Sequence, residues 1–237
     1  MVNVDKNKAL NKKLLNLYHQ KTDTFLQEYK KAFSDDRNPP DQIGTFGIVD
    51  ENWYDIDNGI LVILKETNGW SNEDFCTGNT YIDFVRDISE RGRAVNDGRE
   101  RGEWVSMLMW YNLGRWLTAI QTPQKSTDEI AELYEEALKN LSAAAITNVN
   151  KVRGCETSGR AYSAMARSIP AIDTIKEEIA ILNPETIMFC GTYRLFEDSY
   201  IEELEKKGIK VLELCHPAAR KSKREMIDTV KKYMNIF

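Results

Sequence analysis

The chain contains four short runs of almost uninterrupted apolar residues, separated by longer segments in which apolar residues recur every three or four positions. The short runs are typical of strands buried on both faces, and the longer segments are typical of amphipathic helices. We expect strands at 60–64, 143–149, 186–190 and 209–214. We expect helices at 6–34, 104–120, 126–141, 170–182, 199–207 and 223–234, and 81–90 is compatible with a further helix. Strands that alternate with helices predict an α/β protein with a mainly parallel sheet and helices on both faces.

Local signals support several of these boundaries. Ser126 followed by Glu129 is a capping box, which marks the start of a helix. The turn-rich segment 35–40 ends the first helix. The segment 104–120 is apolar on most faces, which favours a buried helix over a cofactor-binding segment despite its Trp and Met content. We find no repeat and no linker, so we expect one domain over 1–237 with a helical extension at about 1–40.

Charge and composition exclude some classes of function. The net charge of −5 gives no support for non-specific binding of nucleic acid, which depends on positive charge. The chain has no apolar stretch of the roughly 18 residues that a membrane span needs. Its first residues lack the apolar core of a signal peptide, so we expect a cytoplasmic protein with no membrane partner.

The cysteines give no sign of a metal or cofactor. The chain has four, Cys76, Cys155, Cys190 and Cys215, and none forms a C-x-x-C pair. Cys190 and Cys215 lie at the ends of predicted strands and are most simply read as small buried residues. We therefore expect no metal site and no cofactor.

Polar and ionisable residues follow all four predicted strands. In chain order these are Glu66, Asn68 and Gly69; Asn148, Asn150, Lys151 and Arg153; Gly191, Thr192 and Arg194; and His216, Pro217 and Arg220. In an open parallel sheet, ligands bind beyond the carboxyl ends of the strands. A carboxylate and an imidazole brought to that edge by two different strands indicate an active site.

The same segments resemble motifs of the uracil-DNA glycosylase superfamily, most closely its thermophilic-type branch. Lys-Glu-Thr-Asn-Gly at 65–69 is similar to the Gly-Glu-Ala-Pro-Gly motif of that branch. Thr-Asn-Val-Asn-Lys at 147–151 is similar to Thr-Asn-Val-Val-Lys, and His-Pro-Ala at 216–218 is similar to His-Pro-Ser. The similar segments occur in the same order over about 58–225. The resemblance implies a three-layer α/β/α sandwich with a four-stranded parallel core sheet, in the order 2-1-3-4.

Some positions depart from those motifs. Lys65 replaces the first glycine, Asn68 replaces the proline, and Ala218 replaces the serine. The four cysteines that bind an iron–sulfur cluster in that branch are not matched, so the resemblance implies no cluster. These departures bear on the identity of the base more than on the fold.

The resemblance implies a DNA glycosylase that removes a damaged or deaminated base such as uracil, with DNA as its partner. Glu66 would stabilise positive charge on the sugar, and His216 would donate a hydrogen bond to the departing base. The base itself would be bound by Asn148, Tyr81, Asn68 and Gly69, with Asn148 reading its edge and Tyr81 stacking on it. The nucleic-acid backbone would be bound by Arg220, Lys151, Arg153 and Lys221.

Simpler roles exist for several of these residues. Glu66 would also serve as a helix cap, and His216 as a structural histidine with its hydrogen bonds satisfied. At the level of the whole chain, one alternative is a non-catalytic member of the same fold that binds a nucleic acid or nucleotide. Another is an unrelated small-molecule hydrolase, although the chain has no Gly-x-Ser-x-Gly nucleophile motif.

Overall fold

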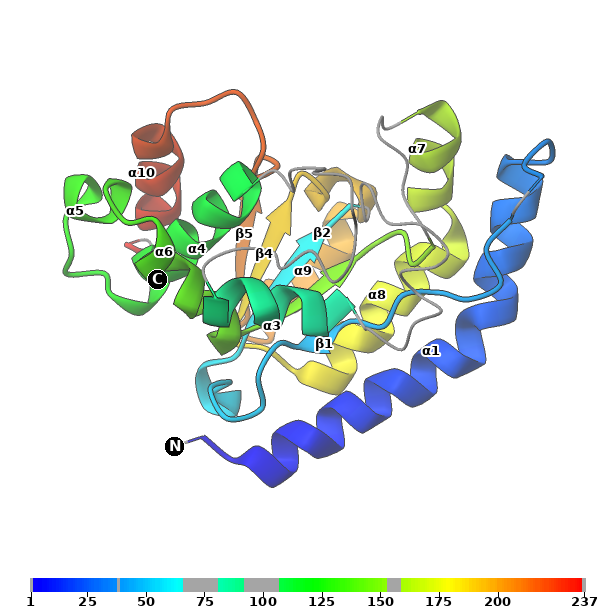
Figure 1. The fold of residues 1–237 in the computed structure, drawn as a ribbon, viewed down its shortest axis with the longest axis horizontal. Helices are drawn as coiled ribbons and strands as arrows, with labels where there is room; N and C mark the ends of the chain where they lie inside the picture. Colours follow the sequence, from blue (N-terminus) through cyan, green and yellow to red (C-terminus); the bar gives the residue numbers. More distant parts are fainter. Residues whose placement is uncertain (1, 38, 66–80, 92–106, 153–158, 236–237) are drawn as a thin grey trace.

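Five strands form one mixed sheet in a computed structural model of the chain (Figure 1). The structure describes residues 2–37, 39–65, 81–91, 107–152 and 159–235. The strands are β1 (Gly47–Ile48), β2 (Ile60–Leu64), β3 (Ala144–Asn148), β4 (Thr186–Cys190) and β5 (Lys210–Leu214). They lie in the order β1-β3-β2-β4-β5. β1 is antiparallel to β3, and the other neighbouring strands are parallel.

The fifth strand corrects the expectation of a purely parallel, four-stranded sheet. β1 is only two residues long and pairs Gly47 with Ile146 and Ile48 with Ala145. Two residues are too few to produce a readable alternation of apolar and polar positions, so the sequence pattern could not reveal this strand. The strands predicted from the apolar runs are all present, and they lie next to one another as β3-β2-β4-β5.

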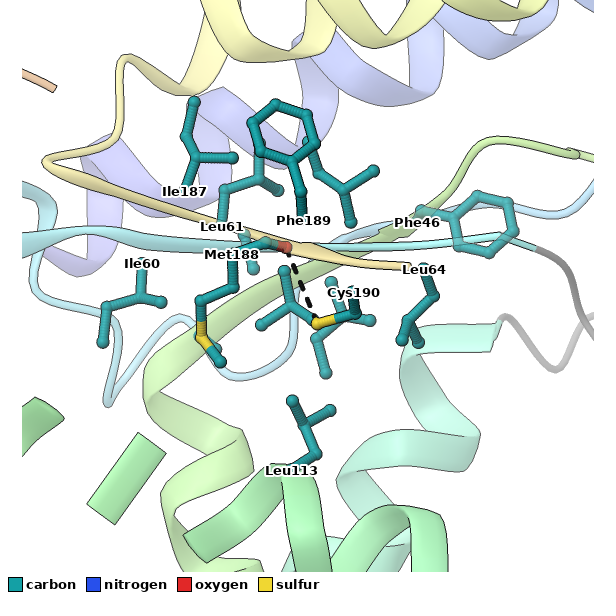
Figure 2. Packing of buried hydrophobic residues seen from close by; sticks show 14 of the residues in the cluster. Phe46, Ile60, Leu61, Leu64, Leu113, Ile187, Met188, Phe189 and Cys190 are labelled. Atoms are coloured by element: carbon teal, nitrogen blue, oxygen red, sulfur yellow. Dashed lines mark hydrogen bonds between the residues drawn. The ribbon is translucent and has the colours of Figure 1, made fainter. Parts of the chain in front are cut away.

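Helices cover both faces of the sheet, as the α/β pattern predicts. α1 and α8 lie on one face, and α3 and α4 lie on the other (Figure 2). The helices are α1 (Val4–Ala32), α3 (Tyr81–Arg91), α4 (Met107–Gln121), α5 (Thr127–Ala131), α6 (Glu135–Leu138), α7 (Arg160–Ala166), α8 (Ile169–Leu182), α9 (Asp198–Lys206) and α10 (Lys223–Met234). Short 3-10 helices span Ile56–Asn58, Lys139–Ala143 and Tyr193–Leu195.

The core explains why the central strands are uniformly apolar. Every residue of β2, β3 and β4 is buried. Successive side chains point to opposite faces, so Ile187 and Phe189 lie toward α8 while Met188 and Cys190 lie toward Leu113 of α4 (Figure 2). Each Å² of apolar surface that folding removes from water stabilises the folded state by about 25 cal/mol. The burial of both faces of these strands is therefore the main contribution that holds the layers together.

The predicted helix from Ser126 to about 141 is interrupted. The capping box of Ser126 and Glu129 is present, but α5 ends at Ala131 and is followed by α6 and a 3-10 turn. In a continuous helix, the carbonyl of Leu133 would accept a hydrogen bond from the backbone N–H four residues later. Here that carbonyl accepts a 2.8 Å hydrogen bond from Nε of Arg115 instead. A tertiary contact therefore overrides the local helical pattern.

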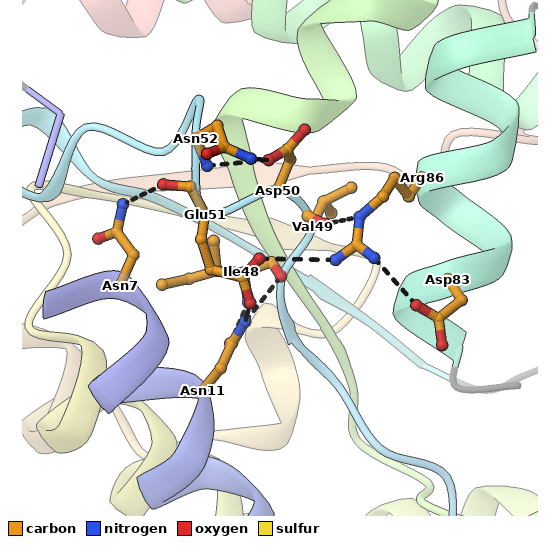
Figure 3. A network of polar contacts seen from close by, with 9 residues as sticks. All are labelled: Asn7, Asn11, Ile48, Val49, Asp50, Glu51, Asn52, Asp83 and Arg86. Carbon is orange, nitrogen blue, oxygen red and sulfur yellow. Dashed lines mark hydrogen bonds and ion pairs between the residues drawn. The ribbon is translucent and has the colours of Figure 1, made fainter. Parts of the chain in front are cut away.

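The N-terminal helix is part of the main core. Asn11 on α1 pairs with both backbone groups of Ile48, its Oδ1 accepting at 2.9 Å and its Nδ2 donating at 3.2 Å (Figure 3). Arg86 on α3 donates to the carbonyl of Val49 at 2.9 Å, which ties the same segment to the opposite helix layer. A side chain at Gly47 would place its Cβ 2.6 Å from Oδ1 of Asn11, and its φ of 147° disfavours any other residue. Glycine at 47 therefore permits the docking of α1.

Candidate functional site

The carboxyl ends of the four parallel strands meet at one edge, as the sequence predicts. In Figure 1 these ends point toward α7 and the segment that precedes α10. Neighbouring strand ends are linked there by backbone hydrogen bonds from Asn150 N to Lys65 O at 2.9 Å and from Gly191 N to Leu214 O at 2.7 Å. Lys65, Asn148, Gly191 and His216 are therefore brought to one edge of the sheet.

Several predicted residues lie outside the described part of the chain. Glu66, Asn68, Gly69 and Arg153 belong to this group, as do Cys76 and Cys155. The expected approach of Glu66 to His216 consequently stays a prediction. Lys65 is the last described residue before Glu66, and its backbone position shows that this strand end lies beside the ends of its neighbours.

His216 is half-buried and is held on two sides. Gly191 adopts a φ of 74°, and a Cβ at this position would lie 3.4 Å from the backbone nitrogen of His216. The backbone N–H of Ala218 donates to Nδ1 of His216 at 3.1 Å. Burial, together with the positive charge of Lys65, lowers the pKa of His216. The ring is therefore neutral near pH 7, and because Nδ1 accepts, its proton lies on Nε2.

Asn148 has an unusual environment at the end of β3. Its side chain is fully buried, and neither its amide nitrogen nor its amide oxygen makes a close hydrogen bond to a described residue, although a weaker interaction joins the amide to the Tyr81 hydroxyl. Burial raises the pKa of Tyr81, and the nearby amide of Asn148 opposes that rise, so the two side chains lie close together. A buried polar group without a partner costs about 1–3 kcal/mol. Such a group calls for a specific explanation, and a polar ligand that binds at the sheet edge is one.

Tyr81 is more enclosed than a stacking platform for a base would be. Its exposed fraction is 3%, and its ring packs near Phe46, Phe84 and Trp110 at centroid distances of 5.1, 6.1 and 6.2 Å. Its hydroxyl end faces Asn148. Among the described residues, Tyr81 thus lies in the core next to Asn148, where it can hold the Asn148 side chain in position.

Lys151 corrects the prediction of a contact with nucleic acid. Its Nζ lies 2.5 Å from Oε1 of Glu178, and the two side chains are 0% and 1% exposed. Thr147 donates to the other oxygen of Glu178 at 2.6 Å, and the Lys151 ammonium also lies 4.6 Å from the centroid of Phe46. An ammonium group enclosed in this way cannot reach a phosphate, so the predicted role of Lys151 was wrong.

The basic residues that follow β5 are mostly paired with acidic ones. Lys221 lies 3.2 Å from Glu225. Arg224 pairs with Asp128 of α5 at 2.6 Å, and Lys223 pairs with Glu132, the residue after α5, at 3.0 Å. Arg220 is exposed and makes no ion pair within the described residues. Of the predicted phosphate contacts that the structure describes, Arg220 is thus the cation that is free to meet an anion.

Two residues near the site were not selected from the sequence. Lys65, treated as a departure from a motif, donates to Ser163 of α7 at 3.1 Å and lies close enough to His216 to lower its pKa. Asn112 on α4 donates to the carbonyl of Pro217 at 2.8 Å. The available signal for Asn112 was its position as a polar interruption in an otherwise apolar helix.

Two hollows are lined by described residues, and neither contains a predicted site residue. The first, of about 330 Å³, lies between α1 and α3 and includes Asn11, Glu51 and Arg86. The second, of about 410 Å³, lies at the amino ends of the strands and includes Ile60, Thr186 and the exposed Trp53. Neither is lined by Asn148 or His216.

Searches for a metal site and a membrane span found neither within the described residues. No group of three or more His, Cys, Asp or Glu side chains in that part of the chain is arranged to hold a metal ion. None of its helices combines the length and apolarity needed to cross a bilayer.

Comparisons with known proteins found no counterpart for this chain. No protein-family model matches it, and no curated protein sequence or solved structure is significantly similar to it. Support for a function therefore comes from the motifs and from the geometry at the carboxyl edge.

Proposed function

We propose that the chain is a DNA glycosylase-like hydrolase that removes a damaged or deaminated base of the uracil type. The observation that carries this proposal is Asn148, whose buried amide makes no close hydrogen bond to the described residues and interacts only weakly with Tyr81. A flipped base is recognised by hydrogen bonds along its edge, which is what such an amide supplies. His216 and Lys65 lie at the same edge of the sheet, where the leaving base would develop charge.

The chemistry needs a donor for the departing base. Water attacks C1′ of the sugar, the bond from C1′ to the base nitrogen breaks, and its electron pair leaves with the base. One proton of the water ends on the base, and its oxygen stays on the sugar as the hydroxyl of an abasic site. His216 suits the leaving base because Nδ1 is occupied by the N–H of Ala218, which leaves the Nε2 proton as the donor.

Positive charge on the sugar needs a carboxylate nearby, and Glu66 is proposed for this role. The motif at 65–69 supports it, because Glu66 directly follows the half-buried Lys65 at the end of β2. Asn68 and Gly69 would complete the binding of the base, with Tyr81 holding Asn148 in place. The order β3-β2-β4-β5 also agrees with the strand order that the family resemblance implied.

The decisive experiment measures base release directly. The purified chain is incubated with single- and double-stranded oligonucleotides that carry one uracil, hypoxanthine or xanthine, and abasic sites are detected by alkaline strand cleavage. We expect cleavage of at least one of these substrates. Binding without cleavage would favour the non-catalytic alternative. Absence of both would reject the two nucleic-acid functions and leave a small-molecule hydrolase.

A further inference from the structure

A buried polar contact connects helix α4 to the segment that carries His216. Asn112 is 2% exposed, and its Nδ2 donates to the carbonyl of Pro217 at 2.8 Å across 105 positions of sequence. Pro217 directly follows His216, and the ring of a proline fixes its own φ near −65°. A hydrogen bond to this carbonyl therefore limits how far the backbone next to His216 can rotate.

Arg115 determines which way the amide of Asn112 faces. Its Nη1 donates to Oδ1 of Asn112 at 3.1 Å. A guanidinium group has donors and no acceptor, so the oxygen of the amide must face Arg115. The amide nitrogen is then directed to Pro217. Without Arg115, an asparagine could turn by 180° and present an oxygen to the carbonyl, which would repel it.

Arg115 is itself held in one position. Its Nε donates to the carbonyl of Leu133 at 2.8 Å, and its guanidinium carbon lies 4.7 Å from the ring centroid of Tyr134. One of its nitrogens, Nη2, is buried without a hydrogen-bond partner among the described residues.

The His216 ring has a contact of its own as well. The backbone N–H of Ala218 occupies Nδ1, and Gly191 lies so near that a Cβ there would be 3.4 Å from the backbone nitrogen of His216. The ring is thus held at Nδ1 by its own turn, and the backbone beside it is held by Asn112 through Pro217.

We infer that Asn112 and Arg115 are positioning residues that hold His216 with its Nε2 proton toward the carboxyl edge of the sheet. The inference rests on the proposed function for what His216 does there, but the orientation of the ring is measurable by itself. Neither residue touches the reacting atoms in this scheme. They act through the carbonyl of Pro217.

The test is imidazole NMR, which suits this chain because it contains only two histidines, His19 and His216. Long-range ¹H–¹⁵N spectra recorded over a pH series give the pKa and the tautomer of each ring. The first variant, Asn112→Asp, keeps the shape of the side chain and its pairing with Arg115 but loses the donor to Pro217. The second, Arg115→Lys, keeps the charge but cannot donate to Leu133 and to Asn112 at the same time. Thr118→Val is the control, since it removes a buried hydrogen bond to Gly114 on the same helix.

In wild type we expect His216 to be the Nε2–H tautomer with a lowered pKa. In both variants the ring gains solvent, so its pKa should rise toward the unperturbed value of about 6.5 and its two tautomers should mix. The rise in Arg115→Lys cannot come from a new charge, and this variant decides the test if Asn112→Asp does not fold. A His216 ring that behaves alike in wild type, folded Arg115→Lys and Thr118→Val would overturn the inference.

The activity assay provides a second readout. If wild type releases a base, the two variants should lower kcat by roughly tenfold to a hundredfold with little change in KM, because displacing a catalytic group by about 1 Å costs on that scale. Thr118→Val should keep the kcat of wild type, and a reduction of equal size in this control would contradict positioning. If wild type releases no base, the proposed function fails while the NMR result still decides the orientation.

Discussion

Lys151 and Glu178 form an ion pair inside the protein, with 2.5 Å between Nζ and Oε1. The pair joins the segment after β3 to helix α8, and Thr147 of β3 adds a hydrogen bond to the same carboxylate. Asn148 lies between Thr147 and Lys151 in sequence. The backbone that presents Asn148 at the sheet edge is therefore anchored on both sides by one buried network.

The first prediction concerns the stability of this pair. Lys151→Met leaves Glu178 buried without its counter-charge, so the free energy of unfolding should fall by about 3–5 kcal/mol. Lys151→Met combined with Glu178→Leu should lose less, because no lone charge stays behind. Urea unfolding measures both. Lys210→Met is the matched control, since the more exposed Lys210–Glu185 pair at 2.9 Å should contribute only about 0–1 kcal/mol. A double variant less stable than Lys151→Met would contradict this account.

The second prediction concerns pH. Burial and Lys65 lower the pKa of His216 in the folded state, so the unfolded chain binds the proton first as the pH falls. The contribution of His216 to stability is complete above about pH 6.5 and is lost as the pH falls through the folded pKa. His216→Gln should therefore lose less unfolding free energy than wild type between pH 7.5 and pH 5. Lys65→Met should show an intermediate loss, because it removes part of the shift. Parallel curves for all three proteins would refute the lowered pKa.

Most of the fold was predictable because its elements are long and strongly patterned. The apolar runs at 60–64 and 186–190 coincide with β2 and β4, and the helix at 223–234 coincides with α10. β1 and α7 were missed because two and seven residues carry too little periodicity to be read. The helix expected up to about 141 was interrupted by a hydrogen bond from Arg115, and no local pattern contains that information.

The site was predictable only as a set of strand ends. The parallel arrangement places Asn148 and His216 at one edge, which follows from the apolar runs alone. Lys151 was misjudged because a lysine after a strand is normally exposed, and the Glu178 that neutralises it is 27 positions away (178 − 151). The coupling of Asn112 to Pro217 depends on how α4 packs, which a sequence pattern does not specify.

The third prediction concerns catalysis. Glu66→Gln keeps the shape of the side chain but removes its charge, and His216→Ala removes the donor to the leaving base. Each should slow base release by roughly a hundredfold or more, which is the scale for loss of one electrostatic contact in a transition state. Single-turnover rates on the best substrate measure the effect, and circular dichroism confirms that each variant is folded. Rates within threefold of wild type for either variant would remove that residue from the mechanism.

The fourth prediction separates the two neighbouring cations after β5. Arg220 is exposed and has no ion-pair partner in the described residues, whereas Lys221 lies 3.2 Å from Glu225. Arg220→Ala should weaken DNA binding and reduce the slope of log K against log salt by about 1. Lys221→Ala should change both less, because its charge is already partly neutralised. Fluorescence anisotropy over a range of salt concentrations checks this. Equal effects of the two variants would show that the ion pair does not govern access to phosphate.

The fifth prediction uses Asn148 to separate function from stability. Leucine keeps the branched shape of asparagine with no polar atoms, although it is the larger side chain, and the Asn148 amide makes no close hydrogen bond among the described residues beyond its weak interaction with Tyr81. Asn148→Leu should therefore change the free energy of unfolding little, because removing a buried unpaired amide gains about 1–3 kcal/mol and fitting the larger leucine costs about the same. The same change should abolish base release, because the edge of the base would face a methyl group. Asn150→Leu is the contrasting variant: Nδ2 of Asn150 donates to the carbonyl of Tyr162 at 3.1 Å, so this variant should be less stable. Urea unfolding and the base-release assay are run on both proteins. If Asn148→Leu is as destabilised as Asn150→Leu and still releases the base, Asn148 is a structural residue and the proposed base site is wrong.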